Sequence, residues 1–272
     1  KISVEQLSRV ENNSALTVAT SEAAQIYYLA LRSDSSINPI MAEKDFRTAI
    51  AKAIDKEGYV EYMMQGYAET AYSVLGPKIF GYTPEAEEAN IAYDPEGAKA
   101  ILDAHPGWAD EKLVFLVPST PAYSKMGEYF QASLKDAGFN NVQIETLDWT
   151  AWLTESQVDN RFDITVYGWS NVTRDGSELM EPNFHSVNGQ KRMRATEEDA
   201  AKLDAYIDAS KTTSDTAVRT ENLQACNNML MEEGYVQPVY NSVNIFCYNN
   251  KYTNITRDPG GAFYVMDFEY AS

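Results

Sequence analysis

The sequence predicts an α/β protein with a mostly parallel central sheet flanked by helices. Two observations support this fold class. Between residues 113 and 169, short apolar runs alternate with amphipathic stretches in the order strand-helix-strand-helix-strand, with short links. Two long helical segments then follow, over 197–210 and 216–233. Strands joined by helical crossovers usually pair in parallel, and the helices then cover both faces of the sheet.

The N-terminal part is expected to form a hairpin followed by two helices. Residues 16–21 and 25–32 are rich in β-branched and aromatic residues, and a short Ser-Glu-Ala-Ala stretch separates them. This pattern is typical of two strands joined by a turn. From residue 45, apolar residues recur at helical spacing with charged residues on the other side. A second helix over 58–65 is expected to end at Gly66.

Residues 67–93 contain many Tyr, Pro and Gly and show little periodicity, so we expect a long irregular loop. Loops of this length inside compact domains are more often functional than incidental. Asp94 should cap a helix that begins at Pro95. The elements expected after it are strands over 113–117, 142–147 and 162–169, helices over 122–137 and 150–158 (capped by Thr150), a helix capped by Thr196, and closing strands over 235–249 and 262–270.

Composition and charge exclude several classes of function. The 272 residues suffice for one large or two modest domains, and the net charge is −18. Such a charge repels phosphate backbones, so nucleic acid is not expected as a partner. The longest apolar runs fall short of the roughly 20 residues that span a bilayer. Cys226 and Cys247 could pair in an oxidising compartment, or remain two buried thiols.

The most informative stretch covers residues 162–175, where an apolar strand ends at Trp169 and a polar loop begins. Ligands of open α/β sheets bind at the carboxyl ends of strands, so Trp169, Ser170, Asn171 and Asp175 are candidate site residues. Gly168 leaves room for an approaching backbone or ligand. The alternative is an ordinary buried strand whose Trp169 packs in the core and whose Asp175 caps a turn.

Motifs for common enzyme chemistry are absent from the sequence. It has no Gly-x-Ser-x-Gly nucleophile motif, no zinc-ligand spacing and no Gly-rich phosphate loop, so no metal or cofactor is expected. Of the two histidines, His105 is explained by a helix end, while His185 could line a pocket or serve a structural role. Asp163 and Asp175 are the first carboxylate pair to consider for glycoside hydrolysis, which their separation would decide.

Five segments resemble the oligopeptide and dipeptide solute-binding proteins of ABC importers, and they follow the order of that family. Residues 45–57 (DFRTAIAKAIDKE) are similar to its D-x-x-V-R-x-A-I-x-x-A-I-D-R-x segment, and residues 162–175 to its F-D-x-x-x-x-G-W-x-x-x-x-x-D segment. The other three matches are Gly-Tyr-Ala at 66–68, YDPEGAKAIL at 93–102, and the helix and strand over 219–240.

The resemblance implies the Rossmann-like lobe (domain III) of a periplasmic-binding-protein type II (cluster C) fold. Family members are longer and have a first lobe that this sequence lacks, so we expect one lobe of a two-lobed protein. Residues 1–33 would form the lead-in strands. Residues 34–240 would form the ligand-binding lobe, and residues 241–272 a tail that returns to the missing N-terminal lobe.

The function implied by the resemblance is that of a substrate-binding subunit, not an enzyme. It would bind di- or oligopeptides between its lobes and deliver them to the membrane subunits of an ABC permease, in the periplasm or as a cell-surface lipoprotein. Two alternatives stay open. An oligosaccharide-binding protein on the same scaffold would suit the 18 tyrosines, and a secreted hydrolase would use paired carboxylates.

The resemblance also implies roles for site residues. Backbone groups of residues 167–171 would bond an extended peptide, while Tyr167 and Trp169 would provide apolar or cation–π walls. In many members the aspartate that holds the ligand amino terminus stands three residues after the tryptophan, where this sequence has Val172. Some relatives place it later, so Asp175 is expected to pair with a ligand ammonium.

Overall fold

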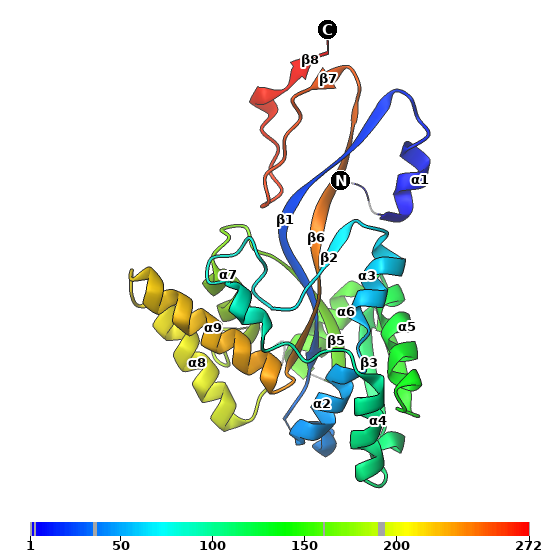
Figure 1. Cartoon of the computed structure of the whole chain (residues 1–272), viewed down its shortest axis with the longest axis vertical. Helices are drawn as coiled ribbons and strands as arrows, with labels where there is room; N and C mark the ends of the chain where they lie inside the picture. The colour runs from blue at the N-terminus through cyan, green and yellow to red at the C-terminus, as the bar shows by residue number, and fades with distance from the viewer. Residues whose placement is uncertain (1, 3, 35–36, 160, 190–193, 272) are drawn as a thin grey trace.

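A computed structural model of the chain describes residues 2, 4–34, 37–159, 161–189 and 194–271. It confirms the α/β class: helices flank a six-stranded sheet in the order β2-β6-β1-β5-β3-β4 (Figure 1). The strands are β1 (Leu16–Leu31), β2 (Ala68–Thr70), β3 (Leu113–Pro118), β4 (Val142–Leu147), β5 (Ile164–Ser170) and β6 (Val236–Asn249).

The sheet is mixed, and its parallel part is the one that the helical crossovers build. Strands β4, β3 and β5 pair in parallel. They are connected through α5 (Pro121–Asp136) and α6 (Trp149–Thr154), as the alternating pattern predicts. Strands β1, β6 and β2 pair antiparallel, and β1 also pairs antiparallel with β5. The parallel arrangement is therefore limited to the strands that short helical links connect.

The predicted N-terminal hairpin is wrong, because residues 16–31 form one continuous strand, β1. β1 pairs with β6 from Leu16 opposite Asn249 to Ala30 opposite Val236, and the register shifts between Glu22 and Ile26. The Ser-Glu-Ala-Ala stretch contains no Gly, Asn or Pro, the residues that a tight hairpin turn usually requires. β1 pairs with the 14-residue strand β6 on both sides of this stretch. The chain therefore passes through a register irregularity instead of turning back.

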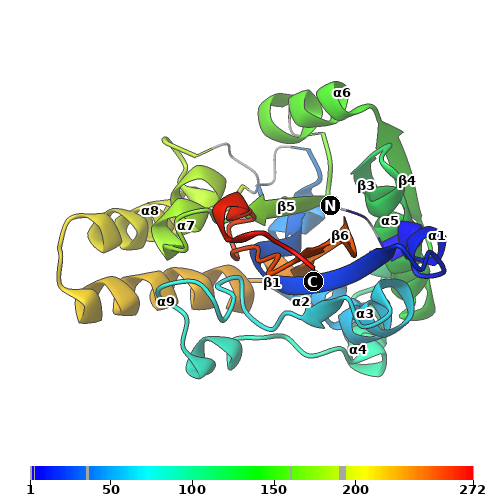
Figure 2. The ribbon, with the colours of Figure 1, turned by 90° about the horizontal axis from the view of Figure 1, so that it is seen from above.

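The helices cover the two faces of the sheet in two groups (Figures 1 and 2). The first group includes α2 (Lys44–Lys52), α4 (Pro95–Ala104) and α5, and a core that includes Phe46, Phe115 and Phe130 lies between it and one face. The second group comprises α6, α7 (Gly176–Phe184), α8 (Glu197–Lys211) and α9 (Thr216–Glu232), and a core that includes Tyr28, Trp152 and Leu230 lies between it and the other face. Two further α-helices are α1 (Leu7–Val10) and α3 (Lys56–Met64).

Two of the three predicted helix caps are confirmed. The side chain of Asp94 accepts a hydrogen bond from the Gly97 backbone N–H at 2.8 Å, which confirms the start of α4. Thr196 likewise caps α8. The predicted cap at Thr150 is wrong: Asp148 caps α6 by accepting bonds from backbone N–H groups, including that of Thr150 at 3.0 Å. The carboxylate two residues upstream is the better-placed acceptor.

Helix α7 was not predicted, because residues 176–184 lie within what the sequence presents as a polar loop. The strand predicted over 262–270 is also largely wrong. Only β8 (Glu269–Tyr270) forms there, paired with β7 (Tyr252–Thr253). This segment and the outer ends of β1 and β6 extend beyond the helices (Figure 1). β6 runs through the boundary expected at 240/241 without a break.

Candidate ligand-binding site

β5 is followed by a short loop, residues 171–175, whose two ends are joined by hydrogen bonds. The Asn171 side chain bridges this loop, donating to the Asp175 carbonyl at 2.7 Å and accepting from the Asp175 N–H at 3.1 Å. The Asn171 backbone N–H donates to the Ala24 carbonyl of β1 at 2.7 Å. Asn171 is buried and also lines a cavity beside β1. The predicted strand-to-loop transition therefore borders a concave surface.

Asp175 already has partners within the protein. Its carboxylate caps α7 by accepting from the Ser177 N–H at 3.0 Å, and it receives two bonds from the Arg219 guanidinium, at 2.7 and 2.8 Å. That guanidinium lies over the Phe80 ring, 4.7 Å from its centroid. Burial alone would raise the pKa of Asp175, but the bonds from Arg219 and Ser177 outweigh it and hold the pKa below its usual value.

The bonds from Arg219 and Ser177 affect how readily Asp175 could bind a ligand ammonium. A ligand ammonium approaching Asp175 would compete with Nη2 of Arg219, which donates to both carboxylate oxygens. Hydrogen bonds between two charged groups are stronger than those between neutral groups. The capping role that we considered as the alternative is present in the structure. The ammonium-binding role of Asp175 stays a prediction. Val172, which the resemblance places where many family members have the acid, is 64% exposed.

The remaining residues of the β5 end divide between core and surface. Tyr167 is fully buried, and its hydroxyl donates to the Ser156 carbonyl at 3.2 Å, so its ring belongs to the core and not to a ligand wall. Trp169 is half-buried and lines a shallow concavity that also includes Asp175. Ser170 is exposed, opposite Gln25 of β1.

Gly168 is required by packing inside the protein. A Cβ atom at this position would lie 2.8 Å from the ring of Tyr27 and 2.9 Å from the hydroxyl of Tyr123. Contacts this short do not occur between real side chains. The room that Gly168 leaves is therefore occupied by two tyrosines and is not open to an approaching ligand.

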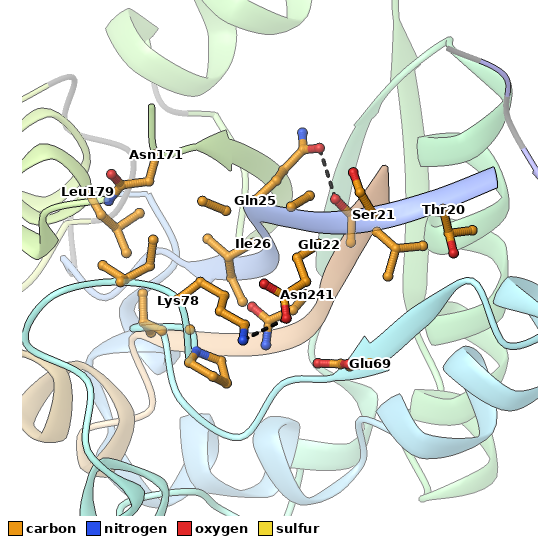
Figure 3. A pocket seen from close by; sticks show the side chains of 18 residues that line it. Thr20, Ser21, Glu22, Gln25, Ile26, Glu69, Lys78, Asn171, Leu179 and Asn241 are labelled. Carbon is orange, nitrogen blue, oxygen red and sulfur yellow. Dashed lines mark hydrogen bonds and ion pairs between the residues drawn. The ribbon is translucent and has the colours of Figure 1, made fainter. Parts of the chain in front are cut away.

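A cavity of about 440 Å³ lies beside the irregular stretch of β1 (Figure 3). Residues 20–26 of β1, residues 241–243 at the middle of β6, and the loop over 74–79 form its walls. This size is within the range typical of small-molecule sites. Its polar lining side chains include Glu22, Gln25, Glu69, Lys78, Asn171 and Asn241.

Most of these cavity residues were not identified from the sequence. Asn171 was a candidate, and the long loop over 67–93 was expected to be functional, which is where Lys78 and Glu69 lie. Glu22 lies in the stretch interpreted as a turn. The available signal was the length and composition of the loop, but no motif marks which of its residues face inward.

A second cavity of about 250 Å³ lies between β1, β6, α3 and α5, and tyrosines form much of its wall. Tyr27 and Tyr240 stack on each other with ring centroids 4.5 Å apart and an interplanar angle of 14°. Tyr59 also stacks on Tyr240, at 6.0 Å. These ring faces are therefore used for packing within the protein.

His185 has a structural role at the end of α7. Its Nδ1 accepts hydrogen bonds from the backbone N–H groups of Val187 and Asn188, both at 3.1 Å. Its two ring nitrogens lie 3.4 and 3.5 Å from carboxylate oxygens of Asp204 and Asp208 on α8. The buried ring lines neither of the two cavities.

The candidate carboxylate pair for glycoside hydrolysis lies at opposite ends of β5. Asp163 precedes β5 and Asp175 follows it, and the seven residues of β5 between them span about 23 Å at about 3.3 Å per residue. Glycosidase carboxylates are about 5–9.5 Å apart. Asp163 instead accepts a bond from the Val114 N–H at 2.7 Å.

Cys226 and Cys247 are free thiols, so the disulfide alternative does not hold in this structure. Among the residues described, no group of three or more His, Cys, Asp or Glu side chains is arranged to hold a metal ion. Within the same residues, no helix is both long and apolar enough to cross a membrane.

The fold is similar to that of solved substrate-binding proteins. It superposes with a TM-score of 0.82 on a dipeptide-binding protein from Pseudoalteromonas sp. SM9913, solved in complex with Met-Leu, at 21% identity, covering 99% of this chain and 53% of that one. The oligopeptide-binding protein AppA from Bacillus subtilis, solved with a nonapeptide, gives a TM-score of 0.80 at 18% identity, covering 100% and 55%.

Sequence comparison then identifies the family. Residues 1–191 match the model of the bacterial extracellular solute-binding proteins, family 5 (middle), and the chain belongs to this family. It is 22% identical over 264 residues to the probable ABC transporter periplasmic-binding protein SapA of Escherichia coli K12, covering 94% of this chain. Because it covers 46% of SapA, the chain spans about half the length of that relative.

Proposed function

We propose that this chain is the ligand-binding lobe of the substrate-binding subunit of an ABC importer, and that its ligands are peptides. Membership of the extracellular solute-binding proteins supports binding without chemical turnover. The name of the oligopeptide-binding protein AppA and the peptides in two of the related structures support peptides as the ligand class. The protein would work outside the cytoplasm, together with permease subunits and the remaining half of the binding protein.

The observation that carries this proposal is the position of the 440 Å³ cavity. It lies where the regular pairing of β1 with β6 is interrupted between Glu22 and Ile26, next to the loop that follows β5. A short peptide can bind in a concave site of this kind, and the polar side chains in its walls then supply selectivity. Trp169, Ser170 and Asn171 would border the bound peptide.

The positions of the tyrosines support oligosaccharide binding less than their number does. Sugar sites use the free face of an aromatic ring, whereas Tyr27, Tyr59 and Tyr240 stack on one another and Tyr240 is buried. The described walls of the 440 Å³ cavity contain no aromatic side chain. Carboxamide, hydroxyl and charged groups there suit the amide and terminal groups of a peptide.

Thermal unfolding of the natural full-length protein tests this function. Alanine peptides of two to six residues should raise the melting temperature, because a ligand at 100 times its Kd stabilises the native state by about 2.7 kcal/mol. Maltose and maltotriose should leave it unchanged. Stabilisation by the sugars without any by the peptides would overturn the proposal, as would turnover of a chromogenic glycoside.

A further inference from the structure

One ion pair connects two walls of the 440 Å³ cavity. Lys78 extends from the loop toward β1, and its Nζ lies 2.7 Å from Oε1 of Glu22 (Figure 3). Among the described residues that line the cavity, Glu69 is the remaining one with a charged side chain. The pair therefore places one positive and one negative group side by side at the proposed peptide site.

The backbone on both sides of this pair is held firmly. The loop near Lys78 is fixed at Val74, whose N–H donates to the Asn227 side chain at 2.9 Å, and at Phe80, whose N–H donates to the Arg174 carbonyl at 2.7 Å. The Glu22 carbonyl accepts from the Asn244 side chain at 2.8 Å. The backbone near Lys78 and at Glu22 is therefore fixed, while their long side chains can rotate and bind another partner.

The ion pair itself is weak enough to be exchanged. The side chains of Lys78 and Glu22 are 47% and 62% exposed. Exposed pairs of this kind contribute little to stability, because water screens them and two long side chains must be ordered. The Asp175–Arg219 pair differs, since both carboxylate oxygens accept from Nη2 of Arg219 and the carboxylate also caps a helix. A ligand would therefore displace the Lys78–Glu22 pair more readily.

We propose that Lys78 and Glu22 together recognise the two charged ends of a short peptide. This inference rests on the proposed peptide-binding function. Lys78 binds the terminal carboxylate and Glu22 the terminal ammonium, and in the empty site each serves as the counter-ion of the other. Neither charge is then left without a partner before or after binding.

The geometry also limits peptide length. The two charged groups start in contact, and each added residue separates the ends of an extended peptide by about 3.3–3.6 Å. The side chains of Lys78 and Glu22 can rotate apart far enough to contact both ends of a peptide of two or three residues. Longer extended peptides would contact one of the two groups but not both. The predicted ligands are therefore di- and tripeptides with both ends free.

The test compares four forms of dialanine and trialanine by titration calorimetry on the natural full-length protein: unmodified, C-terminally amidated, N-acetylated, and blocked at both ends. The wild type should bind the unmodified form about tenfold more tightly than either singly blocked form. Lys78→Met should bind the unmodified and amidated forms equally. Glu22→Gln should bind the unmodified and N-acetylated forms equally.

A matched control comes from the exposed pair Lys202–Glu198 on α8, with Nζ and Oε1 2.8 Å apart and side chains 50% and 80% exposed. Lys202→Met and Glu198→Gln make the same charge changes away from the cavity and should preserve the wild-type preferences. If both cavity variants discriminate as the wild type does, or if the wild type binds all forms equally, the charge-recognition inference is refuted while peptide binding stands. If no form of dialanine or trialanine binds but longer alanine peptides do, the inference is likewise refuted and peptide binding stands. If no alanine peptide of two to six residues binds, peptide binding itself fails.

Discussion

Lys56 provides a sharp test of the packing beneath the cavity loop. It is the first residue of α3 and is 4% exposed. Its Nζ donates to the Ala71 carbonyl at 2.8 Å and to the Asn90 side chain, and it lies 4.8 Å from the centroid of the Tyr72 ring. One buried amine thus connects α3 to both ends of the loop that carries Lys78.

Burial lowers the pKa of Lys56 from 10.5 to about 7. Between these values the unfolded chain binds a proton that the folded protein binds less well, so the free energy of unfolding rises with pH in this window. The gap corresponds to about 5 kcal/mol at about 1.36 kcal/mol per pH unit. Between pH 7 and pH 9, the contribution of Lys56 should rise by about 2 kcal/mol.

Urea unfolding of the wild type and of Lys56→Met at pH 7, 8 and 9 measures this contribution. Methionine has a similar length without the titrating group, so the stability difference between the two proteins should shift in favour of the wild type by about 2 kcal/mol across the range. The variant also leaves two acceptors without a donor, at a cost of about 1–3 kcal/mol. The diagnostic is therefore the slope and not the absolute difference.

Lys99→Met is the control, because Lys99 is exposed and pairs with Asp103 one turn along α4. Its stability difference from the wild type should not change over this pH range. A constant difference between the wild type and Lys56→Met would refute the reasoning, since it would mean that the buried amine does not titrate differently in the folded and unfolded states.

Three further substitutions test the site. Asn227→Ala should lower the free energy of unfolding by about 2–4 kcal/mol and weaken peptide binding, because the buried amide fixes the cavity loop; urea unfolding and calorimetry check this. Gly168→Ala should destabilise by about 1–3 kcal/mol through its clash with Tyr27, measured by thermal unfolding. Asp175→Asn should lower the melting temperature, because it weakens the contact with Arg219. It should also weaken the binding of free and N-acetylated peptides equally. A loss confined to peptides with a free amine would instead make Asp175 the ammonium partner.

Elements with local signals could be predicted from the sequence alone. The caps at Asp94 and Thr196 were predicted because a side-chain oxygen and the N–H that it accepts from lie three residues apart. The parallel strands β3, β4 and β5 follow from the alternation of periods along the chain. The family was also identified from short segments in a fixed order, which needs no knowledge of contacts.

Which side chains face the candidate cavity depends on contacts between distant parts of the chain. Asp175 gains Arg219 from 44 positions away, and Lys78 meets Glu22 across 56 positions. The course of β1 depended on β6, whose residues follow more than 200 positions later. Pairings of this kind arise from how the chain packs, and the sequence near each residue carries no record of the partner. The sequence therefore indicated the region of the site, and packing determined its charges.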